Sequence, residues 1–202
     1  VEVWSVPEGS EKEATRRLDS DPAVVYAEPN SILHAFATPN DPNLNKQWYH
    51  SVIGSAAAWD VTTGTQRVVI AVIDSGIDET HPDLAGILVA GYDMVGDDAD
   101  PHDENGHGTH VAGIVGAQGN NAVGVAGMAW NAAIMPVRVL DSYGQGPLDG
   151  IADGVIWASS NGARVLNLSL GSYQWSQTLA DAVAMARGRG CLLVGAMGND
   201  NK

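Results

Sequence analysis

The residues best suited to proton transfer lie in two short motifs. Asp74 belongs to the run VIDSGID, and His107 begins the run HGTHVAG. A carboxylate beside an imidazole can fix the ring tautomer and stabilise the protonated ring, which is what a general base requires. Such a base acts on a nucleophile, and none of the serines stands in a context that marks it as one. The two motifs therefore predict half of a proton-transfer site.

Each motif has another interpretation when it is taken alone. Asp74 could be a turn aspartate or part of the Asp-Ser-Gly loop of a pepsin-like aspartic protease, but the sequence has no second such loop and no all-β pattern. His107 and His110 are three residues apart, a spacing at which two imidazoles on a helix can bind zinc. A zinc site is disfavoured because the glutamate of HExxH and an obvious third ligand are missing.

Two polar residues follow apolar runs in the C-terminal part of the chain. Asn199 comes after CLLVGAMG, and its amide could donate a hydrogen bond to an oxyanion that develops during a reaction. Ser169 ends the run LNLS. Taken alone, the asparagine is an ordinary turn residue and the serine a helix cap. Their order and placement relative to Asp74 and His107 favour a shared site.

Composition excludes several classes of function. The 202 residues carry a formal charge of −14, are 45% hydrophobic and have a mean hydropathy of −0.05, which is typical of a soluble globular protein. The negative charge argues against nucleic acid, and no basic amphipathic stretch or long apolar run indicates a membrane. A monomer is expected. The single cysteine, Cys191, cannot form an intrachain disulfide and is expected in the core.

Beyond residue 37, apolar runs alternate with helical patterns. Strands covered on both faces are expected at 67–74, 132–140, 163–170 and 191–196. Helices are expected at 107–117, 147–160 and 176–187, the last two closed by left-handed caps at Asn161-Gly162 and Gly188. The pattern predicts an α/β fold, a parallel sheet with helices on both faces. Ligands bind at the carboxyl ends of such strands, where Asp74, Ser169 and Asn199 fall.

The N-terminal residues differ from the rest. EVWSVPEG and AVVYAEPN predict two strands, and SEKEATRRLDSD predicts an exposed helix between them, so this part is a small α+β unit. The proline- and asparagine-rich stretch FATPNDPNLN predicts a linker with little regular structure. We therefore expect two domains, residues 1–36 and 37–202.

Taken together, these ordered motifs resemble the subtilisin-like serine proteases, the subtilases, and most closely their thermitase-like branch. The resemblance covers the whole chain and implies a subtilisin-like parallel sheet. VIDSGID and HGTHVAG match the family segments that carry the catalytic aspartate and histidine, which implies these roles for Asp74 and His107. GND matches the segment of the oxyanion asparagine, which implies that role for Asn199. Two further segments match the substrate-binding edge and the wall of the primary specificity pocket: Gly144, Gln145 and Gly146, and Ser169, Leu170 and Gly171.

The resemblance implies secretion and the hydrolysis of peptide bonds in peptide or protein substrates by acyl transfer. It also implies that residues 1–36 are the C-terminal part of an inhibitory propeptide, an intramolecular partner that would be cleaved near Phe36 or Ala37. The family's nucleophile lies in a Gly-Thr-Ser-Met-Ala run, and the 202 residues contain no such run. Because loss of this serine removes about 10⁶ in turnover, we expect the 202 residues alone to be inactive. The alternative is a naturally short, non-catalytic relative that binds peptides or its propeptide.

Acidic residues crowd the segment from 93 to 104, which is repulsive unless the segment is solvated or binds a hard cation. The resemblance to thermitase favours calcium, with Asp93, Asp98 and Asp100 as ligands, although His102 stands where an amide ligand is expected. The resemblance implies a second structural calcium site as well. Its ligands would be the side chains of Asp41, Asp83 and Asn121 and the backbone carbonyls of Gln118, Val123 and Val125.

Overall fold

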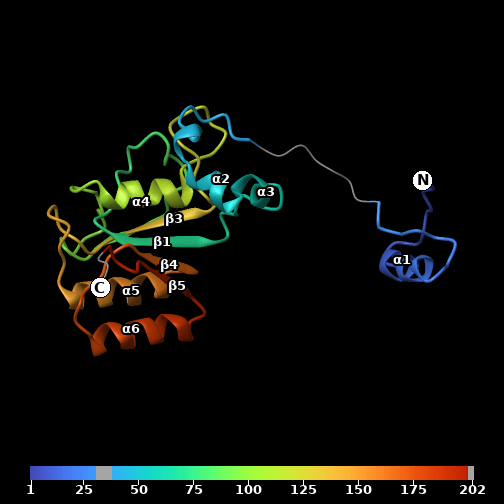
Figure 1. Ribbon diagram of the computed structural model, residues 1–202. Helices are drawn as coiled ribbons and strands as arrows, with labels where there is room; N and C mark the ends of the chain where they lie inside the picture. The colour runs from blue at the N-terminus through green and yellow to red at the C-terminus, as the bar shows by residue number, and fades with distance from the viewer. Residues whose placement is uncertain (31–37, 200–202) are drawn as a thin grey trace. The chain divides into compact units, whose positions relative to one another are not determined.

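The computed structural model describes residues 1–30 and 38–199, and the chain divides into two compact units, Val1–Ala35 and Phe36–Lys202. The described part of the first unit contains one helix, α1 (Glu11–Asp19), as the sequence predicts (Figure 1). Acidic residues lie in its first turn and Arg16 and Arg17 in its last, which suits the helix dipole. The expected boundary and cleavage point near Phe36 and Ala37 lie outside the described residues.

The two strands predicted beside α1 are wrong, because neither 2–9 nor 23–30 forms a strand. Two short strands are marginal in water unless a third strand or a packed face supports them. The apolar side chains that would form such a face are instead exposed. They are Val3, Trp4, Val25 and Tyr26.

The second unit is built on a parallel sheet with the strand order β2-β3-β1-β4-β5. The predicted strands are confirmed as β1 (Val69–Asp74), β3 (Ala133–Arg138), β4 (Val165–Leu168) and β5 (Leu192–Gly195). The two-residue strand β2 (Tyr92–Asp93) was not expected, because it is too short to show an apolar pattern. Asp74 is the last residue of β1 and lies in register with Arg138 of β3.

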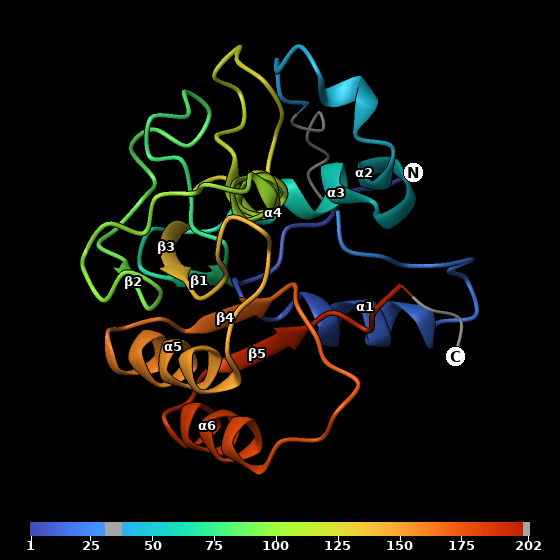
Figure 2. The same ribbon diagram turned by 90° about the vertical axis from the view of Figure 1, so that its left-hand side faces the viewer.

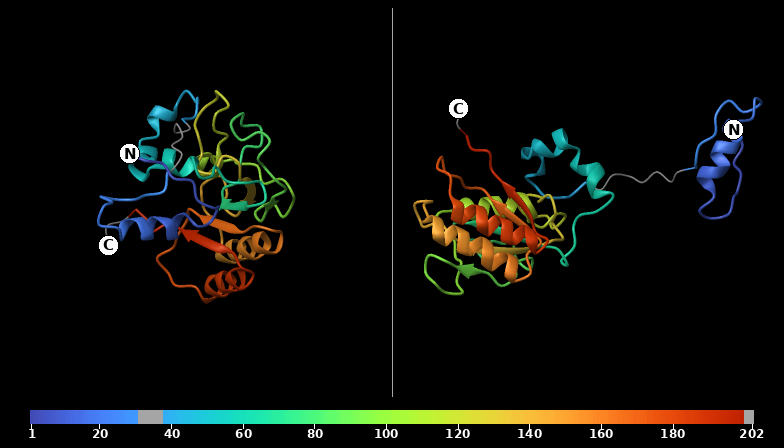
Figure 3. Two further views of the ribbon diagram at one scale, coloured as in Figure 1. Left: turned by 90° about the vertical axis from the view of Figure 1, so that its right-hand side faces the viewer. Right: turned by 90° about the horizontal axis from the view of Figure 1, so that it is seen from below.

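Helices cover both faces of the sheet, as expected. The helix α4 (His107–Gly116) lies on one face, and α5 (Leu148–Ser160) and α6 (Gln177–Gly188) lie on the other (Figures 1 and 2). Figure 3 shows α5 and α6 side by side. The chain before β1 forms the short elements η1 (Leu44–Lys46), α2 (Tyr49–Ile53) and α3 (Ser55–Trp59), which the sequence did not predict. No helix in the described ranges is both long and apolar enough to cross a bilayer.

One of the two predicted helix caps is correct. Gly162 has a φ of 99° and closes α5 in the left-handed conformation. Gly188 is instead the last residue of α6, and Gly190, with a φ of 84°, makes the turn into β5. Gly190 can end the helix in place of Gly188, because the N–H of Arg189 still donates to the carbonyl oxygens of Met185 and Ala186 as in a helix.

The core has two layers that β1 separates. Ile73 and Ala71 pack with α5 and α6, and Val72 packs with α4, so β1 is apolar on both faces. The sequence predicts that β5 is also covered on both faces. This prediction is wrong, because Leu192 is 62% exposed and Val194 is 45% exposed. These two alternate residues share one face, and the helix packed on β5, α6, covers the other. Cys191 is buried in the layer beside α6, as expected.

Candidate active site

The predicted pair forms a direct hydrogen bond. His107 Nδ1 lies 2.7 Å from Asp74 Oδ1, and because an ionised carboxylate only accepts, the ring proton lies on Nδ1. The Asp74 side chain is 0% exposed, whereas that of His107 is 48% exposed. The Nε2 edge of the ring is thereby left to act on a reactant from solvent.

The Asp74 carboxylate is buried with little hydrogen-bonding support. Oδ1 also accepts from the backbone N–H of Ser75 at 2.8 Å. Oδ2 is buried and has no hydrogen-bond partner among the described residues. The hydrogen bond from His107 is therefore one of only two that this buried carboxylate accepts from the described residues.

Close approach of two backbones brings the pair together. A Cβ at Gly108 would lie 2.1 Å from the carbonyl oxygen of Gly76, so only glycine lets α4 approach the end of β1. A Cβ at Gly76 would lie 2.5 Å from the carbonyl oxygen of Pro101, and Gly76 has a φ of 101°. Gly76 and Gly108 are therefore required for the close contact that places His107 beside Asp74.

The first turn of α4 is capped by three side chains, which fixes the position of His107. The free N–H groups of a helix start need acceptors. The N–H of His107 donates to Asn105 Oδ1 at 3.2 Å, and that of Gly108 donates to Ser75 Oγ at 2.9 Å. The N–H of Thr109 donates to Asp103 Oδ2 at 2.9 Å. One of these caps, Ser75, follows Asp74 directly, so the histidine helix is tied to the aspartate strand.

Asp103 is the centre of this network. Its Oδ1 accepts from Ser75 Oγ at 2.8 Å and from the N–H of Gly106 at 2.8 Å, and its Oδ2 accepts from Thr109 Oγ1 at 2.6 Å. Burial alone would raise the pKa of Asp103, but the hydrogen bonds from Thr109, Gly106 and Asn105 outweigh it and lower the pKa below its ordinary value. Asp103 therefore stays ionised and holds the base in place.

Asn105 links the base to one predicted substrate segment. Its side-chain Nδ2 donates to the carbonyl oxygen of Ser142 at 3.0 Å. Ser142 precedes the predicted segment Gly144–Gly146, where the loop turns on Asp141, whose Oδ1 accepts from the N–H of Gln145 at 3.0 Å. Gly144 and Gln145 are exposed, as a segment that pairs with another chain must be.

The other predicted residues lie at the same edge of the sheet without contacting the pair. Ser169 and Leu170 follow β4 and are partly buried, and Gly171 is exposed. Ser169 Oγ accepts from Asn167 Nδ2 at 2.9 Å. Asn199 lies on the exposed segment after β5. Because the strands are parallel, their carboxyl ends share one edge, but the structure brings only Asp74 and His107 within hydrogen-bonding distance.

The predicted ligands Asp41 and Asp83 are buried carboxylates, 5% and 1% exposed. Within residues 38–199 neither forms an ion pair with a lysine, arginine or histidine. Both accept hydrogen bonds from the loop 118–125: Asn120 N–H donates to Asp41 at 2.7 Å and Val125 N–H to Asp83 at 2.8 Å. Buried negative charge of this kind fits a hard cation with oxygen ligands.

Asn121, another predicted ligand, contacts Asp83. Its Oδ1 accepts from the N–H of Val123 at 2.7 Å, and its Nδ2 donates to Asp83 Oδ1 at 2.9 Å. The Oδ1 atom of Asn121 has a second lone pair that could bind a cation. Gln118 is held to the same aspartate through its backbone, whose N–H donates to the carbonyl oxygen of Asp83 at 2.9 Å.

The carboxylates of the acidic segment 93–104 have different partners. Asp93 is buried, and its Oδ2 lies 3.2 Å from Arg138 Nη1 in an ion pair. Arg138 also forms an ion pair with Glu104. An ideal Cβ at Gly96 would lie 3.0 Å from Asp93 Oδ2 and 3.4 Å from Asp98 Oδ2, so these two carboxylates converge. Asp98 Oδ1 accepts from the N–H of Asp100. Asp103 caps α4 and Glu104 pairs with Arg138, whereas the carboxylates of Asp93 and Asp98, two of the three predicted ligands, lie close to each other.

Sequence reasoning missed Ser75, Asp103 and Asn105. Their signal is weak, because an aspartate and an asparagine before a glycine also suit a solvated turn. Asp103 was missed because it lies in the acidic segment 93–104. A run of carboxylates is more readily interpreted as a cation site than as a source of helix caps.

Comparisons with known proteins agree with this geometry. The model of the subtilase family matches residues 65–202. A thermophilic serine proteinase from Bacillus sp. (strain AK1) is 48% identical over 193 residues, covering 95% of this chain and 48% of the relative. Thermitase from Thermoactinomyces vulgaris is 44% identical over 163 residues, covering 80% of this chain and 58% of the relative. The chain thus spans about half the length of these relatives.

A solved structure supports the fold. A protease from Pseudoalteromonas arctica matches with a TM-score of 0.75 and 39% identity, covering 82% of this chain and 60% of that one. The expected parallel sheet with helices on both faces is confirmed by this likeness. Other relatives carry the names extracellular protease, from Xanthomonas campestris, and minor extracellular protease, from Bacillus subtilis.

Proposed function

The chain belongs to the subtilase family of serine peptidases, and from this premise we propose that it supplies the acid, the base and the oxyanion donor of a secreted serine endopeptidase. The observation that carries the proposal is the 2.7 Å hydrogen bond from His107 to the buried Asp74. The reaction is acyl transfer from a peptide bond of a peptide or protein substrate.

In the proposed reaction His107 Nε2 takes the proton of a serine hydroxyl as the serine attacks the peptide carbonyl. Asp74 keeps the ring in the Nδ1–H tautomer and stabilises the imidazolium that forms. The proton then passes from Nε2 to the leaving amine. A water molecule then attacks the acyl-enzyme while His107 Nε2 takes its proton. The proton is returned to the serine oxygen as the acid product leaves.

Asn199 would donate its amide to the oxyanion of the tetrahedral intermediate, a contact worth about 2.7–4 kcal/mol in subtilisin. The segment Gly144–Gly146 would pair with the substrate backbone, and Ser169–Gly171 would form a wall of the primary specificity pocket. Their positions after strands of one parallel sheet support these roles, because the carboxyl edge of such a sheet is where ligands bind.

The serine itself is expected in a Gly-Thr-Ser-Met-Ala run, which the 202 residues do not contain. We therefore propose that the 202 residues alone do not hydrolyse peptides. A fluorophosphonate probe, which reacts with activated serines, tests this directly. It should leave the 202-residue chain unlabelled and label a longer chain that includes the coding sequence downstream of Lys202.

The same comparison separates the enzyme from the alternative. Serine-to-alanine exchange in the downstream Gly-Thr-Ser motif should abolish both labelling and peptide hydrolysis. A stop codon directly after Lys202, or a longer chain that is folded yet unlabelled, would favour a non-catalytic relative that binds peptides or its own propeptide.

Residues 1–36 would be the C-terminal part of an inhibitory propeptide. Their separation as a compact unit supports this proposal, as does the Bacillus relative, whose similarity extends over 95% of the chain. Secretion is supported by relatives that are named extracellular proteases. N-terminal sequencing of the active longer chain should find cleavage near Phe36 or Ala37, and an active chain that retains residue 1 would contradict the assignment.

Calcium would be held by Asp41, Asp83 and the loop 118–125, with Gln118, Val123 and Val125 offering backbone carbonyls. A weaker site would use Asp93, Asp98 and Asp100. A bound Ca²⁺ supplies positive charge for buried carboxylates and thereby joins the chain before β1 to the loop after α4. Its role is structural.

Calorimetry with and without chelator tests the calcium proposal. A cation at about 100 times its dissociation constant stabilises the folded chain by about 2.7 kcal/mol, so chelation should lower Tm clearly. Asp83→Asn should remove most of this response. An unchanged Tm on chelation would contradict the proposal.

A further inference from the structure

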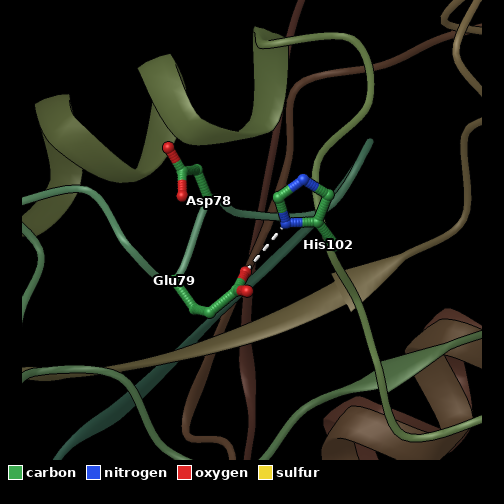
Figure 4. Close-up of side chains that lie close together, drawn as sticks. All are labelled: Asp78, Glu79 and His102. Carbon is green, nitrogen blue, oxygen red and sulfur yellow. Dashed lines mark hydrogen bonds and ion pairs between the residues drawn. The ribbon is translucent and has the colours of Figure 1, made fainter.

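His102 takes part in a cluster outside the expected calcium ligands. Its Nδ1 lies 2.9 Å from Glu79 Oε2, and Asp78 lies beside them (Figure 4). One ligand atom from each of these three residues lies within 4.8 Å of the others. The described residues contain no other such grouping of histidine, cysteine, aspartate or glutamate.

The backbone that presents the cluster is well held. The segment after β1 meets the segment before α4, where Ile77 N–H donates to the carbonyl oxygen of Pro101 at 3.0 Å. The N–H of Asp78 donates to Thr109 Oγ1 at 2.9 Å. Both segments are therefore fixed before any ligand binds, which lowers the entropic cost of binding.

One ligand side chain is oriented as well. Asp78 Oδ1 accepts from the N–H and the hydroxyl of Thr80, at 2.9 and 2.6 Å. Hydrogen bonds of this kind orient metal-ligating carboxylates and raise affinity. Glu79 and His102 are half-exposed, so a cation and its remaining water ligands can reach the site from solvent.

The donor set selects the class of cation. One imidazole nitrogen with two carboxylate oxygens suits first-row divalent metals such as Zn²⁺, whereas Ca²⁺ takes oxygen ligands alone. His102 Nδ1 and Glu79 Oε2 are 2.9 Å apart and share a proton, which a metal ion would replace. Two ligands of a tetrahedral ion lie about 3.4 Å apart, so only a small side-chain shift is needed to admit it.

We propose that Asp78, Glu79 and His102 form a binding site for a divalent transition metal, with Zn²⁺ as the best-suited ion. The bound metal clips the segment that follows Asp74 to the segment that precedes His107. It takes no part in proton transfer, because neither Asp74 nor His107 is among its ligands and His107 Nδ1 is already bonded to Asp74.

The 202-residue chain tests this proposal with metal alone, in buffer containing excess Ca²⁺ so that hard-cation sites are saturated. Co²⁺ should give the visible absorption of a site with nitrogen and oxygen ligands, and Zn²⁺ should displace it stoichiometrically. Zn²⁺ should also raise Tm. His102→Gln should weaken Zn²⁺ binding by about tenfold or more and remove the rise in Tm.

His110→Gln is the matched control, because it removes an exposed histidine from α4 and leaves the cluster intact. Its Zn²⁺ affinity should equal that of the parent chain. Glu79→Gln, an exposed change with little risk to folding, should weaken binding as His102→Gln does. Unchanged binding in both cluster variants, or loss of binding in His110→Gln, would overturn the assignment.

Discussion

Asp74 ends one strand of the parallel sheet and Asn199 follows another, but their surroundings differ. Around Asp74, β1 is covered by α4 on one face and by α5 and α6 on the other, and His107 is held by a network of side-chain caps. Around Asn199, β5 exposes Leu192 and Val194, and the segment after it is exposed.

This difference shows which part of the site the 202 residues can build alone. The groups that position His107, the proposed base, all belong to the chain from β1 to α4. Asn199, the proposed oxyanion donor, lies after the edge strand β5, which has one exposed apolar face. The two proposed roles, proton abstraction and oxyanion binding, therefore rest on different parts of the molecule and can be disturbed separately.

The largest expected effect on the free energy of unfolding distinguishes the covered strand β4 from the edge strand β5. Leu166 of β4 is fully buried, and Leu192 of β5 lies one strand away, next to its register neighbour Val165. Leu166→Ala should lower the free energy of unfolding by about 2–5 kcal/mol, whereas Leu192→Ala should cost less than about 0.5 kcal/mol. Urea unfolding measures both. Equal losses would mean that β5 is as enclosed as β4.

A smaller effect is expected at the contact between α4 and β1. Gly108→Ala places a Cβ against the Gly76 carbonyl and should cost about 1–3 kcal/mol, because the helix must move away from the strand. Gly113→Ala, in the same helix with open space at its Cβ, should stabilise by up to about 1 kcal/mol. If both variants gained stability in urea unfolding, the close contact would not hold in solution.

The smallest effect is a pH dependence at Asp103. Its folded-state pKa lies below the ordinary value, so its contribution is fully present above the ordinary pKa and is lost as pH falls through the folded value. Asp103→Asn should lower the free energy of unfolding by about 1 kcal/mol at neutral pH and by progressively less in acid. Asp153→Asn, an exposed control in the middle of α5, should show no such trend. A constant difference at all pH values would exclude the ionised cap.

Much of the second unit could be predicted from the sequence, because continuous apolar runs such as RVVIAVID must be buried on both faces. The pair Asp74 and His107 was also predictable, since each ends or begins an element whose pattern is clear. The exposure of β5 was not, because an apolar run reports what a strand prefers to bury and not whether another element covers it.

The caps of α4 show a second limit. Ser75, Asp103 and Asn105 act through contacts between segments far apart in the chain, and polar residues near glycine look alike whether they face solvent or a helix start. The predicted strands beside α1 failed for a related reason, since Val3 and Tyr26 favour a strand locally but the described unit provides no packed face.

The central claim is that the 202 residues hold a complete base without the nucleophile. It is tested most directly by the tautomer of His107, read from two-bond ¹H–¹⁵N NMR spectra at a pH where the ring is neutral. The structure predicts the Nδ1–H tautomer for His107, and its loss in Asp74→Ala. A neutral His107 protonated at Nε2, as in a free imidazole side chain, would contradict it.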